Sequence, residues 1–284
     1  MDSSDLLLTG QVAVVTGGGG GIGRGISIEL ARAGADVVVA DIDTDRAQRT
    51  AELVRAAGRE ALAVTTDVMD SDQVRAAVAA ADDGFGRLDI LVNNAGGVNG
   101  RRFLDQSERS WRRHIEINLV SMLAATSAAV PLMIRGGRGG SIVNVSSIEG
   151  SRAAPTFAVY AACKAGMISF TRTMAVELGE HAIRVNCISP DQTATPGNHG
   201  MRTGPIPDDL PPRPPAIAEG IARYVPLRRE GVVEECGSVV VFLCSRLAAY
   251  VTGANIPVDG GAWASSGWVG SPDGGWQLYP GMGG

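Results

Sequence analysis

The sequence is poor in the features that mark several large classes of protein. Aromatic residues make up only 5% of its 284 residues, and its formal net charge at pH 7 is −5. A nucleic-acid-binding protein normally has a basic face, so this acidic balance argues against a nucleic-acid partner. The four cysteines lack CxxC or metal-ligand spacing and the three histidines are scattered. We therefore expect buried free thiols in a reducing cytoplasm and no metal site.

Targeting and membrane segments are lacking as well. The first residues carry no basic stretch, and Leu6-Leu7-Leu8 is too short for the core of a signal peptide. No apolar run approaches the ~20 residues that a membrane span needs. The sequence thus predicts a cytoplasmic protein with no membrane partner.

Glycine and aliphatic residues are abundant instead, with 38 glycines and 45% apolar residues. Short β-branched runs alternate with longer stretches that carry apolar residues at helical spacing, a pattern typical of repeated βαβ units. The predicted strands are Val12–Thr16, Asp36–Ala40, Ala61–Thr66, Ile90–Asn93, Ser141–Val145, Arg184–Ile188 and Asn255–Val258. The predicted helices are Ile22–Ala33, Asp45–Ala57, Ser71–Asp83, Arg109–Ile134, Tyr160–Leu178 and Glu234–Ser245. The fold class is therefore α/β: one Rossmann-like domain (1–266), a doubly wound parallel sheet of about seven strands with helices on both faces.

Two segments break this rhythm. The stretch 196–226 holds six prolines between 205 and 215, so it cannot form one regular helix, and we interpret it as a substrate lid. The tail 267–284 is rich in Gly and Pro yet carries Trp268, Trp276 and Tyr279. Because disordered tails rarely hold so many aromatic residues, we expect this one to pack on a surface, such as that of a neighbouring subunit.

A glycine-rich turn follows the first predicted strand. The chain turns at Gly17 and enters a helix near Ile22, an arrangement in which backbone N–H groups at a helix N-terminus meet an anion. The spacing of Gly17, Gly21 and Gly23 is looser than the usual dinucleotide fingerprint, and five consecutive glycines match many patterns. The motif alone therefore leaves open a low-complexity turn without a phosphate ligand.

The second predicted strand ends at Asp41, about 20 residues after the glycines, where an acidic side chain receives a ribose 2′-hydroxyl. A carboxylate there repels a 2′-phosphate, and the nearest following cation is Arg46. This pattern favours NAD over NADP. The alternative is that Asp41 merely opens the next helix, together with Asp43 and Asp45.

Two further strand ends are expected to meet the same ligand. Asp67 and Val68 close the third strand, where the adenine end would lie. Asn94, Ala95 and Gly96 close the fourth. Small residues there let a cofactor lie against the backbone, while the Asn94 side chain is expected to bond a neighbouring main chain.

Hydroxyl and ammonium groups gather after the fifth strand. Ser146 and Ser147 end that strand, and Tyr160 and Lys164 follow at i,i+4 spacing, which puts phenol and ammonium on one helix face. An ammonium at ~4 Å and a positively charged nicotinamide both favour phenolate, so we expect the pKa of Tyr160 to lie below its ordinary ~10.

These elements together resemble the short-chain dehydrogenase/reductase family over about residues 9 to 262. Thr16–Gly23 is similar to its cofactor loop, Asn93–Gly96 to its Asn-Asn-Ala-Gly element, and Tyr160/Lys164 to its Tyr-x-x-x-Lys pair. The resemblance implies that Tyr160 is the acid/base, that Ser147 holds the substrate oxygen and that Lys164 binds the nicotinamide ribose. Asn118, which matches the catalytic asparagine of the family, would position a water of the proton relay.

One segment departs from the family pattern. After the sixth strand the family usually has Pro-Gly followed by a threonine, whereas here Asp191 follows Pro190. The resemblance implies that Thr193 and Thr195 meet the nicotinamide carboxamide. Asp191 requires a turn that a non-glycine residue tolerates, and its carboxylate is a candidate to face the substrate.

The function implied is an NAD-dependent oxidoreductase that interconverts a secondary alcohol and a ketone, working as a homotetramer. An NADPH-dependent 3-oxoacyl-thioester reductase and a non-catalytic dinucleotide-sensing protein stay open as alternatives. A sterol, a thioester, a sugar and a cyclic diol all remain allowed as substrates. Arg152 lies near the expected substrate pocket, where we expect an exposed surface arginine rather than a partner of an acidic substrate.

Overall fold

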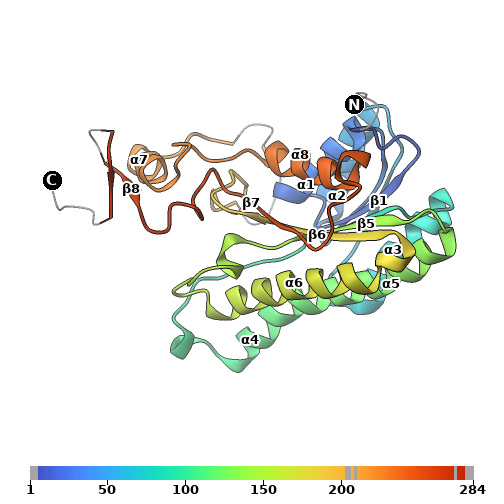
Figure 1. Cartoon of the computed structure of the whole chain (residues 1–284), viewed down its shortest axis with the longest axis horizontal. Helices are drawn as coiled ribbons and strands as arrows, with labels where there is room; N and C mark the ends of the chain where they lie inside the picture. The colour runs from blue at the N-terminus through green and yellow to red at the C-terminus, as the bar shows by residue number, and fades with distance from the viewer. Residues whose placement is uncertain (1–5, 202–205, 208–209, 272–273, 279–284) are drawn as a thin grey trace.

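Seven parallel strands form one sheet in the order β3-β2-β1-β4-β5-β6-β7 in the computed structural model, which describes residues 6–201, 206–207, 210–271 and 274–278 (Figure 1). The strands are β1 Val12–Thr16, β2 Asp36–Asp41, β3 Ala61–Thr65, β4 Ile90–Asn93, β5 Gly140–Val145, β6 Ile183–Pro190 and β7 Asn255–Val258. β1 pairs with both β2 and β4, so the strand order reverses beside β1. The predicted doubly wound sheet is confirmed, and ligands bind such sheets at this reversal.

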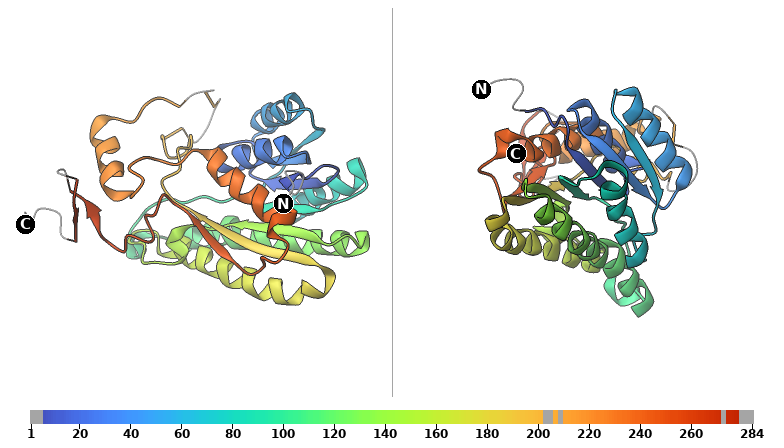
Figure 2. Two further views of the ribbon diagram at one scale, coloured as in Figure 1. Left: turned by 45° about the horizontal axis from the view of Figure 1, so that its top comes forward. Right: turned by 90° about the vertical axis from the view of Figure 1, so that its right-hand side faces the viewer.

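Helices cover both faces of the sheet (Figure 2). One layer holds α1 Gly21–Arg32, α2 Thr44–Ala56 and α8 Val233–Cys244. The other holds α3 Ser71–Phe85, α4 Glu108–Ile115, α5 Ser121–Gly136 and α6 Ala158–Glu177. A remaining helix, α7 Pro215–Tyr224, lies outside both layers beside the short strands β8 Val269–Gly270 and β9 Trp276–Gln277.

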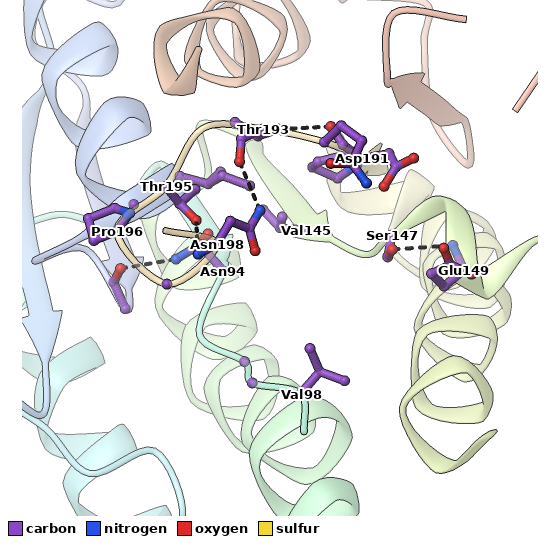
Figure 3. Close-up of a pocket in the computed structure, with 18 of the residues that line it drawn as sticks. Asn94, Val98, Val145, Ser147, Glu149, Asp191, Thr193, Thr195, Pro196 and Asn198 are labelled. Carbon is purple, nitrogen blue, oxygen red and sulfur yellow. Dashed lines mark hydrogen bonds between the residues drawn. The ribbon is translucent and has the colours of Figure 1, made fainter. Parts of the chain in front are cut away.

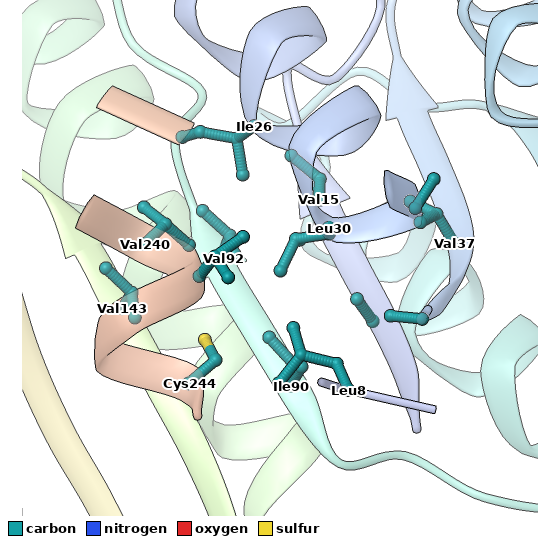
Figure 4. Close-up of a cluster of buried hydrophobic side chains, with 14 of the residues drawn as sticks. Leu8, Val15, Ile26, Leu30, Val37, Ile90, Val92, Val143, Val240 and Cys244 are labelled. Carbon is teal, nitrogen blue, oxygen red and sulfur yellow. The ribbon is translucent and has the colours of Figure 1, made fainter. Parts of the chain in front are cut away.

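The core is two-sided because successive residues of a strand point to opposite faces of the sheet. In β1, Ala13 and Val15 belong to the cluster under α1 and α8, while Val12 and Val14 belong to the cluster under α3 and α5. Figure 4 shows the first cluster, with side chains of α1 and α8 over the strands. Strands buried on both faces are continuous apolar runs, which made them recognisable in the sequence. All four cysteines are buried and free, as expected.

Three segments differ from the sequence-based prediction. The helix predicted over Arg109–Ile134 is interrupted by a π-helical turn, Glu116–Val120, between α4 and α5. The proline-rich stretch is not one regular helix, as predicted, but its end forms α7 with Pro215 at the start, where the missing N–H of proline costs nothing. The tail, for which no strand was predicted, contains β8 and β9.

One helical stretch has the length and composition of a membrane span, contrary to the expectation from the sequence. It is Glu108–Gly136, and 39% of its most apolar window is buried within the protein. α5 packs against α3 and against β4 and β5 of the sheet. The same composition is found in core helices of soluble proteins, so a single stretch of this kind is weak evidence for a membrane.

Glycines let α1 and α8 approach each other closely. A Cβ atom added at Gly25 would lie 2.7 Å from the Cβ of Val233. One added at Gly237 would lie 2.7 Å from Cγ of Glu29 and 3.0 Å from the carbonyl oxygen of Gly25. Because α1 begins at the glycine loop, this contact fixes the direction in which the helix meets the edge of the sheet.

Gly237→Ala is therefore expected to destabilise the fold by roughly 1–3 kcal/mol, since its methyl group overpacks the α1–α8 contact. In a chain of this size, that lowers the melting temperature by several degrees. Gly179→Ala is the matched control, because nothing lies within 4 Å of its added Cβ. Thermal unfolding followed by circular dichroism checks the prediction, and equal melting temperatures for the two variants would contradict it.

Candidate active site

The carboxyl ends of β1, β4, β5 and β6 open into one cavity of about 1080 Å³ (Figure 3). The glycine loop lines one end, Ser147 and Glu149 line the other, and Ile217 and Ile221 of α7 lie against it. This volume exceeds that of most small-molecule pockets. Most residues predicted for the site line it: Gly17, Gly21, Ile22, Asp41, Asn94, Ala95, Gly96, Asn118, Ser147, Tyr160, Lys164, Pro190, Thr193 and Thr195.

The glycine loop is held by the side chain of Asn94. Its Nδ2 donates to the carbonyl oxygens of Thr16 at 2.9 Å and Gly17 at 3.0 Å, which confirms the expected bond to a neighbouring main chain. Gly17 has φ +62°, a left-handed conformation that favours glycine. A Cβ at Gly23 would lie 2.1 Å from the carbonyl oxygen of Gly17. Close packing therefore requires glycine at position 23, which is not among the described residues that line the cavity, and its contact with a cofactor stays a prediction.

The N-terminus of α1 is built to meet an anion. Its N-cap, Gly20, has no side chain to satisfy the first N–H groups, and the first turn contains no acidic residue. Gly20, Gly21 and Ile22 all line the cavity. The positive end of the helix dipole and the N–H groups of the first turn therefore fit the pyrophosphate of a dinucleotide.

Asp41 stands at the end of β2 in the same cavity. Its Oδ2 accepts from the backbone N–H of Gly19 at 2.9 Å, and its Oδ1 accepts from that of Asp43 at 3.0 Å. The N-cap of α2 is Asp43, whose carboxylate accepts from the N–H of Arg46. The alternative in which Asp41 merely opens the next helix is therefore wrong. Arg46 also lines the cavity, close to Asp43 at 3.4 Å.

Asp67 and Val68, expected at the adenine end, are not among the described residues that line the cavity. The Asp67 side chain accepts from the N–H of Met69 at 3.0 Å, within its own loop. Contact of this pair with adenine stays a prediction.

The turn after β6 accommodates Asp191 without strain at that residue. Gln192, not Asp191, takes the positive φ, +31°. Thr193 is buried and its hydroxyl donates to the carbonyl oxygen of Asp191, while Thr195 Oγ1 accepts from the N–H of Asn198. Both threonines line the cavity, and their contact with a carboxamide stays a prediction.

Asn118 lies in the π-helical turn and is fully buried. Its Nδ2 donates to the carbonyl oxygens of Gly97 at 2.8 Å and His114 at 2.9 Å, and its Oδ1 accepts from the N–H of Gly97 at 3.0 Å. The amide thus ties the loop after β4 to the helix. A π turn inside an α-helix frequently marks a functional position.

The two serines at the end of β5 have different partners. Ser146 Oγ donates to the carbonyl oxygen of Lys164 at 3.0 Å, inside the protein. Ser147 Oγ accepts from the N–H of Glu149 at 3.2 Å and hydrogen-bonds Tyr160. Ser147 thus lies beside Tyr160 at the cavity, and its role toward a substrate oxygen stays a prediction.

The pKa of Tyr160 is raised to about 12, opposite to the shift expected from the sequence. Burial is the main cause, and the carboxylates of Glu149 and Asp191 add to it. The hydrogen bond from Ser147 acts the other way. Lys164 Nζ lies 5.6 Å from the centre of the Tyr160 ring. The protein by itself thus holds a neutral phenol, the form that gives a proton to a ketone.

Lys164 is the only lysine of the chain, since the other 24 basic residues are arginines. Its side chain is 3% exposed, and Nζ donates to the carbonyl oxygen of Val145 at 2.8 Å. Burial lowers its pKa to about 8, although the neighbouring thiols of Cys187 and Cys163 oppose that shift. Arginine would not lose its charge in this way, so the residue type matters here.

A polar network beside Ser147 was not predicted. Tyr224 of α7 donates its hydroxyl to Asp191 Oδ2 at 2.5 Å. Arg152 binds Glu149 at 2.6 Å and lies 3.8 Å from Asp191. The expectation of an exposed surface arginine is wrong, because Arg152 is half-buried between these carboxylates. Proline at the start of the segment 215–224 was the available signal for the helix that carries Tyr224.

Comparison with known proteins gives the same assignment as the site. Residues 9–262 match the family described as "Enoyl-(Acyl carrier protein) reductase". The chain belongs to the short-chain dehydrogenase/reductase family. It is 39% identical to "Oxidoreductase UcpA" of Salmonella typhimurium over 90% of this chain and 95% of the relative. It is 37% identical to "Trans-4-hydroxycyclohexanecarboxylate dehydrogenase" of Sinomonas cyclohexanicum over 90% and 94% of the two chains.

A solved structure of this family has the same fold. It is a 7α-hydroxysteroid dehydrogenase in complex with NADH and 7-oxo glycochenodeoxycholic acid, 34% identical, with a TM-score of 0.84 over 92% of this chain and 97% of the other. This chain is therefore an oxidoreductase of the short-chain dehydrogenase/reductase family, as predicted from its motifs.

The end of the chain lies beyond the part that matches the family. Gly270 of β8 accepts from Nε of Arg223 in α7, so the described part of the tail packs beside α7 of its own chain. Trp268 and Trp276 stay about half exposed. Tyr279, the third aromatic residue of the predicted tail cluster, lies outside the described residues.

Because Lys164 is the only lysine, its titration is directly measurable. In protein labelled with ¹³C-lysine, we expect one side-chain signal that titrates with a midpoint of about 8. Lys164→Met should abolish this signal and so serves as the assignment control. A midpoint near the ordinary 10.5 would show that burial does not lower the pKa of Lys164 and would contradict the prediction.

The same variant has a predicted effect on stability. A lowered folded pKa means that the charged form weakens the fold below about pH 8, and that this penalty disappears as the pH rises toward 10.5. The buried charge lowers the free energy of unfolding by at most roughly 3 kcal/mol, which Lys164→Met would restore. Loss of the hydrogen bond to Val145 would cost about 1 kcal/mol of this. We expect Lys164→Met to stabilise the protein by about 1–2 kcal/mol at pH 7, and less at pH 10, in urea unfolding.

Proposed function

We propose that the protein is an NAD(H)-dependent oxidoreductase that interconverts a secondary alcohol and a ketone, with Tyr160 as general acid/base. One observation carries this proposal. A single cavity contains the Tyr160 phenol, the Ser147 hydroxyl and the Lys164 ammonium together with an uncapped helix N-terminus and the carboxylate of Asp41. These groups fit a substrate oxygen at one end and a dinucleotide at the other.

The reaction divides between the protein and its cofactor. When bound, the nicotinamide ring accepts the hydride in oxidation and donates it in reduction. Tyr160 donates its proton to the ketone oxygen in reduction, and as phenolate it takes the hydroxyl proton in oxidation. Ser147 donates its hydroxyl proton to the same oxygen, on which negative charge develops in the transition state.

Lys164 and Asn118 support this centre in different ways. The ammonium of Lys164 has three protons, and one of them is used by Val145, which leaves two for ribose hydroxyls and water. Its charge favours the phenolate during oxidation. The amide of Asn118 binds Gly97 and His114, so we propose that its main-chain carbonyl, within the π turn, positions the relay water.

The choice of NAD rests on Asp41. Both of its oxygens accept hydrogen bonds from the backbone, which fixes the carboxylate at the cavity wall, where it suits ribose hydroxyls and repels a phosphate. The 7α-hydroxysteroid dehydrogenase of similar fold was solved with NADH, which supports the same choice. A relative that is 36% identical, the "3-oxoacyl-[acyl-carrier-protein] reductase" of Synechocystis sp., keeps an NADPH-dependent 3-oxoacyl-thioester reductase as the second candidate.

We further propose a cytoplasmic homotetramer whose subunits are single domains (1–266), with the segment 196–226 as substrate lid and 267–284 as tail. Four free buried cysteines suit a reducing compartment. Exposed apolar side chains at the end of α4 and on α5, including Ile115, Leu123 and Ile134, suit a contact between subunits.

Tyr160→Phe tests the chemistry. It should lower turnover by roughly 10²–10⁴-fold, because the proton donor is removed, while NADH binding followed by fluorescence stays intact. Tyr250→Phe is the control, since Tyr250 is fully exposed. A screen of alcohols and ketones followed by NADH absorbance supplies the substrate. Turnover within a few-fold of wild type would show that Tyr160 is not the acid/base, and no turnover of any alcohol by wild type would favour the dinucleotide-sensing alternative.

Asp41→Asn tests the cofactor. Removing the charge should lower the ratio of kcat/KM for NAD⁺ to kcat/KM for NADP⁺ at least tenfold, because the repulsion of a 2′-phosphate is lost. Asp45→Asn removes an equal charge from an exposed position in the first turn of α2 and should leave the ratio unchanged. A wild-type preference for NADPH above tenfold would overturn the NAD assignment.

A further inference from the structure

The substrate end of the cavity carries a charge pattern that the proposed reaction does not require. Glu149 and Asp191 line the cavity near Ser147 (Figure 3). Their side chains are 20% and 13% exposed, so both carboxylates lie partly removed from water. Salt screens the interactions of partly buried charges less than those of charges on an open surface.

Both carboxylates act on the reacting group itself. They line the same cavity as Tyr160, and their charges add to the upward shift of its pKa, of which burial is the main cause. Glu149 is two residues from Ser147 and donates its N–H to the Ser147 hydroxyl. An anionic group on a substrate held by Ser147 and Tyr160 would therefore lie in a field of its own sign.

The nearest cation does not cancel this charge. Arg152 binds Glu149 and lies near Asp191, and its guanidinium stacks 5.6 Å from the ring centre of Tyr224. One cation against two carboxylates leaves the group negative. Arg152 is not among the described residues that line the cavity, so it is placed to hold the carboxylates rather than to meet a ligand.

The other cations of the described lining are engaged elsewhere. Lys164 binds Val145 and lies at the catalytic centre. Arg46 lies at the cofactor end, beside Asp43. Arg213 makes two hydrogen bonds to Glu230 and one to the carbonyl oxygen of Asn198. Among the described residues, the substrate end therefore presents hydrogen-bond acceptors and no unpaired cation.

Tyr224 fixes this arrangement. Because its hydroxyl donates to Asp191, it turns no proton toward a substrate carboxylate. The same bond joins α7 to the end of β6, so the acidic wall and the apolar side chains of α7 form one surface. That surface suits an uncharged substrate that is apolar on one side and donates hydrogen bonds on the other.

We propose that Glu149 and Asp191 are specificity-determining residues that exclude carboxylate-bearing alcohols and ketones and select neutral substrates that donate hydrogen bonds. Ionised carboxylates only accept hydrogen bonds, so they favour a hydroxyl or an amide N–H over a second carboxylate. This inference rests on the proposed oxidoreductase function and deepens it by naming the substrate class.

A matched pair of substrates tests the proposal. The probes are 4-hydroxycyclohexanecarboxylate and 4-hydroxycyclohexanecarboxamide, which have nearly the same shape and differ in charge and in donor groups. With wild-type enzyme and NAD⁺, the carboxamide should have a kcat/KM at least tenfold higher. If neither is oxidised, the pair is compared as competitive inhibitors of the best alcohol from the screen, with the same expected ratio of inhibition constants.

Isosteric variants identify the cause. Asp191→Asn and Glu149→Gln should each lower the ratio several-fold by admitting the carboxylate, while Asp83→Asn, an exposed change of equal charge on α3, should not. Arg202 lies outside the described residues, so the variant Arg202→Ala is measured as well. In this variant the carboxylate should still have a lower kcat/KM than the carboxamide.

Several results would overturn the proposal. A wild-type ratio near one, a preference for the carboxylate, or a ratio unchanged in both Asp191→Asn and Glu149→Gln would each do so. Failure of both probes to bind an enzyme that oxidises other alcohols would also count against it, because charge would then not be what the pocket selects. Failure of the oxidoreductase function itself is distinct, since no alcohol would then be oxidised at all.

Discussion

The site depends on a single buried ammonium. Lys164 carries its charge into the interior with one protein partner, the carbonyl oxygen of Val145, and burial lowers its pKa to about 8. An isolated buried charge is costly, and elsewhere this chain uses arginine for its cations. A guanidinium would stay charged and would need partners for five N–H groups. Lysine is compact enough to be buried on the same face of α6 as Tyr160. The fold is therefore less stable than it would be with an apolar residue there, because the site needs a positive charge.

Amides of asparagine hold the sheet edge around that charge. Asn93 donates to Asn144 across β4 and β5 at 2.8 Å, and Asn144 donates to Thr171 of α6 at 2.8 Å. Asn94 reaches from the end of β4 to the glycine loop, and Asn118 ties the following loop to the π turn. Satisfied buried polar networks are rigid and specify one arrangement, unlike an apolar contact of equal size. The glycine loop, Tyr160 and Lys164 are therefore held relative to one another by hydrogen-bonded amide side chains.

The fold and the catalytic groups were predictable because they are encoded locally. The runs 12–15 and 37–40 are apolar throughout, and the i,i+4 spacing of Tyr160 and Lys164 fixes their shared face whatever surrounds them. What was missed depends on contacts between distant segments. The pKa of Tyr160 moves upward mainly because the fold buries its side chain, and also because Glu149 and Asp191 approach it in space, and no spacing along the chain reports either effect. Arg152 was expected on the surface although one partner, Glu149, is only three residues away, because its second partner, Asp191, is 39 residues away. The π turn at Asn118 is equally hidden, because its apolar pattern continues that of the flanking helices.

Asp191 links substrate choice to the direction of the reaction. In place of the glycine usual in the family, it brings a carboxylate that binds Tyr224 and raises the pKa of Tyr160. A higher pKa keeps the phenol protonated, which favours proton donation to a ketone and makes proton removal from an alcohol harder at neutral pH. The same negative charge that disfavours an anionic substrate therefore also favours the reductive direction. Burial of the phenol raises its pKa further, whereas the charge of Lys164, and that of a nicotinamide bound as proposed, would favour the phenolate.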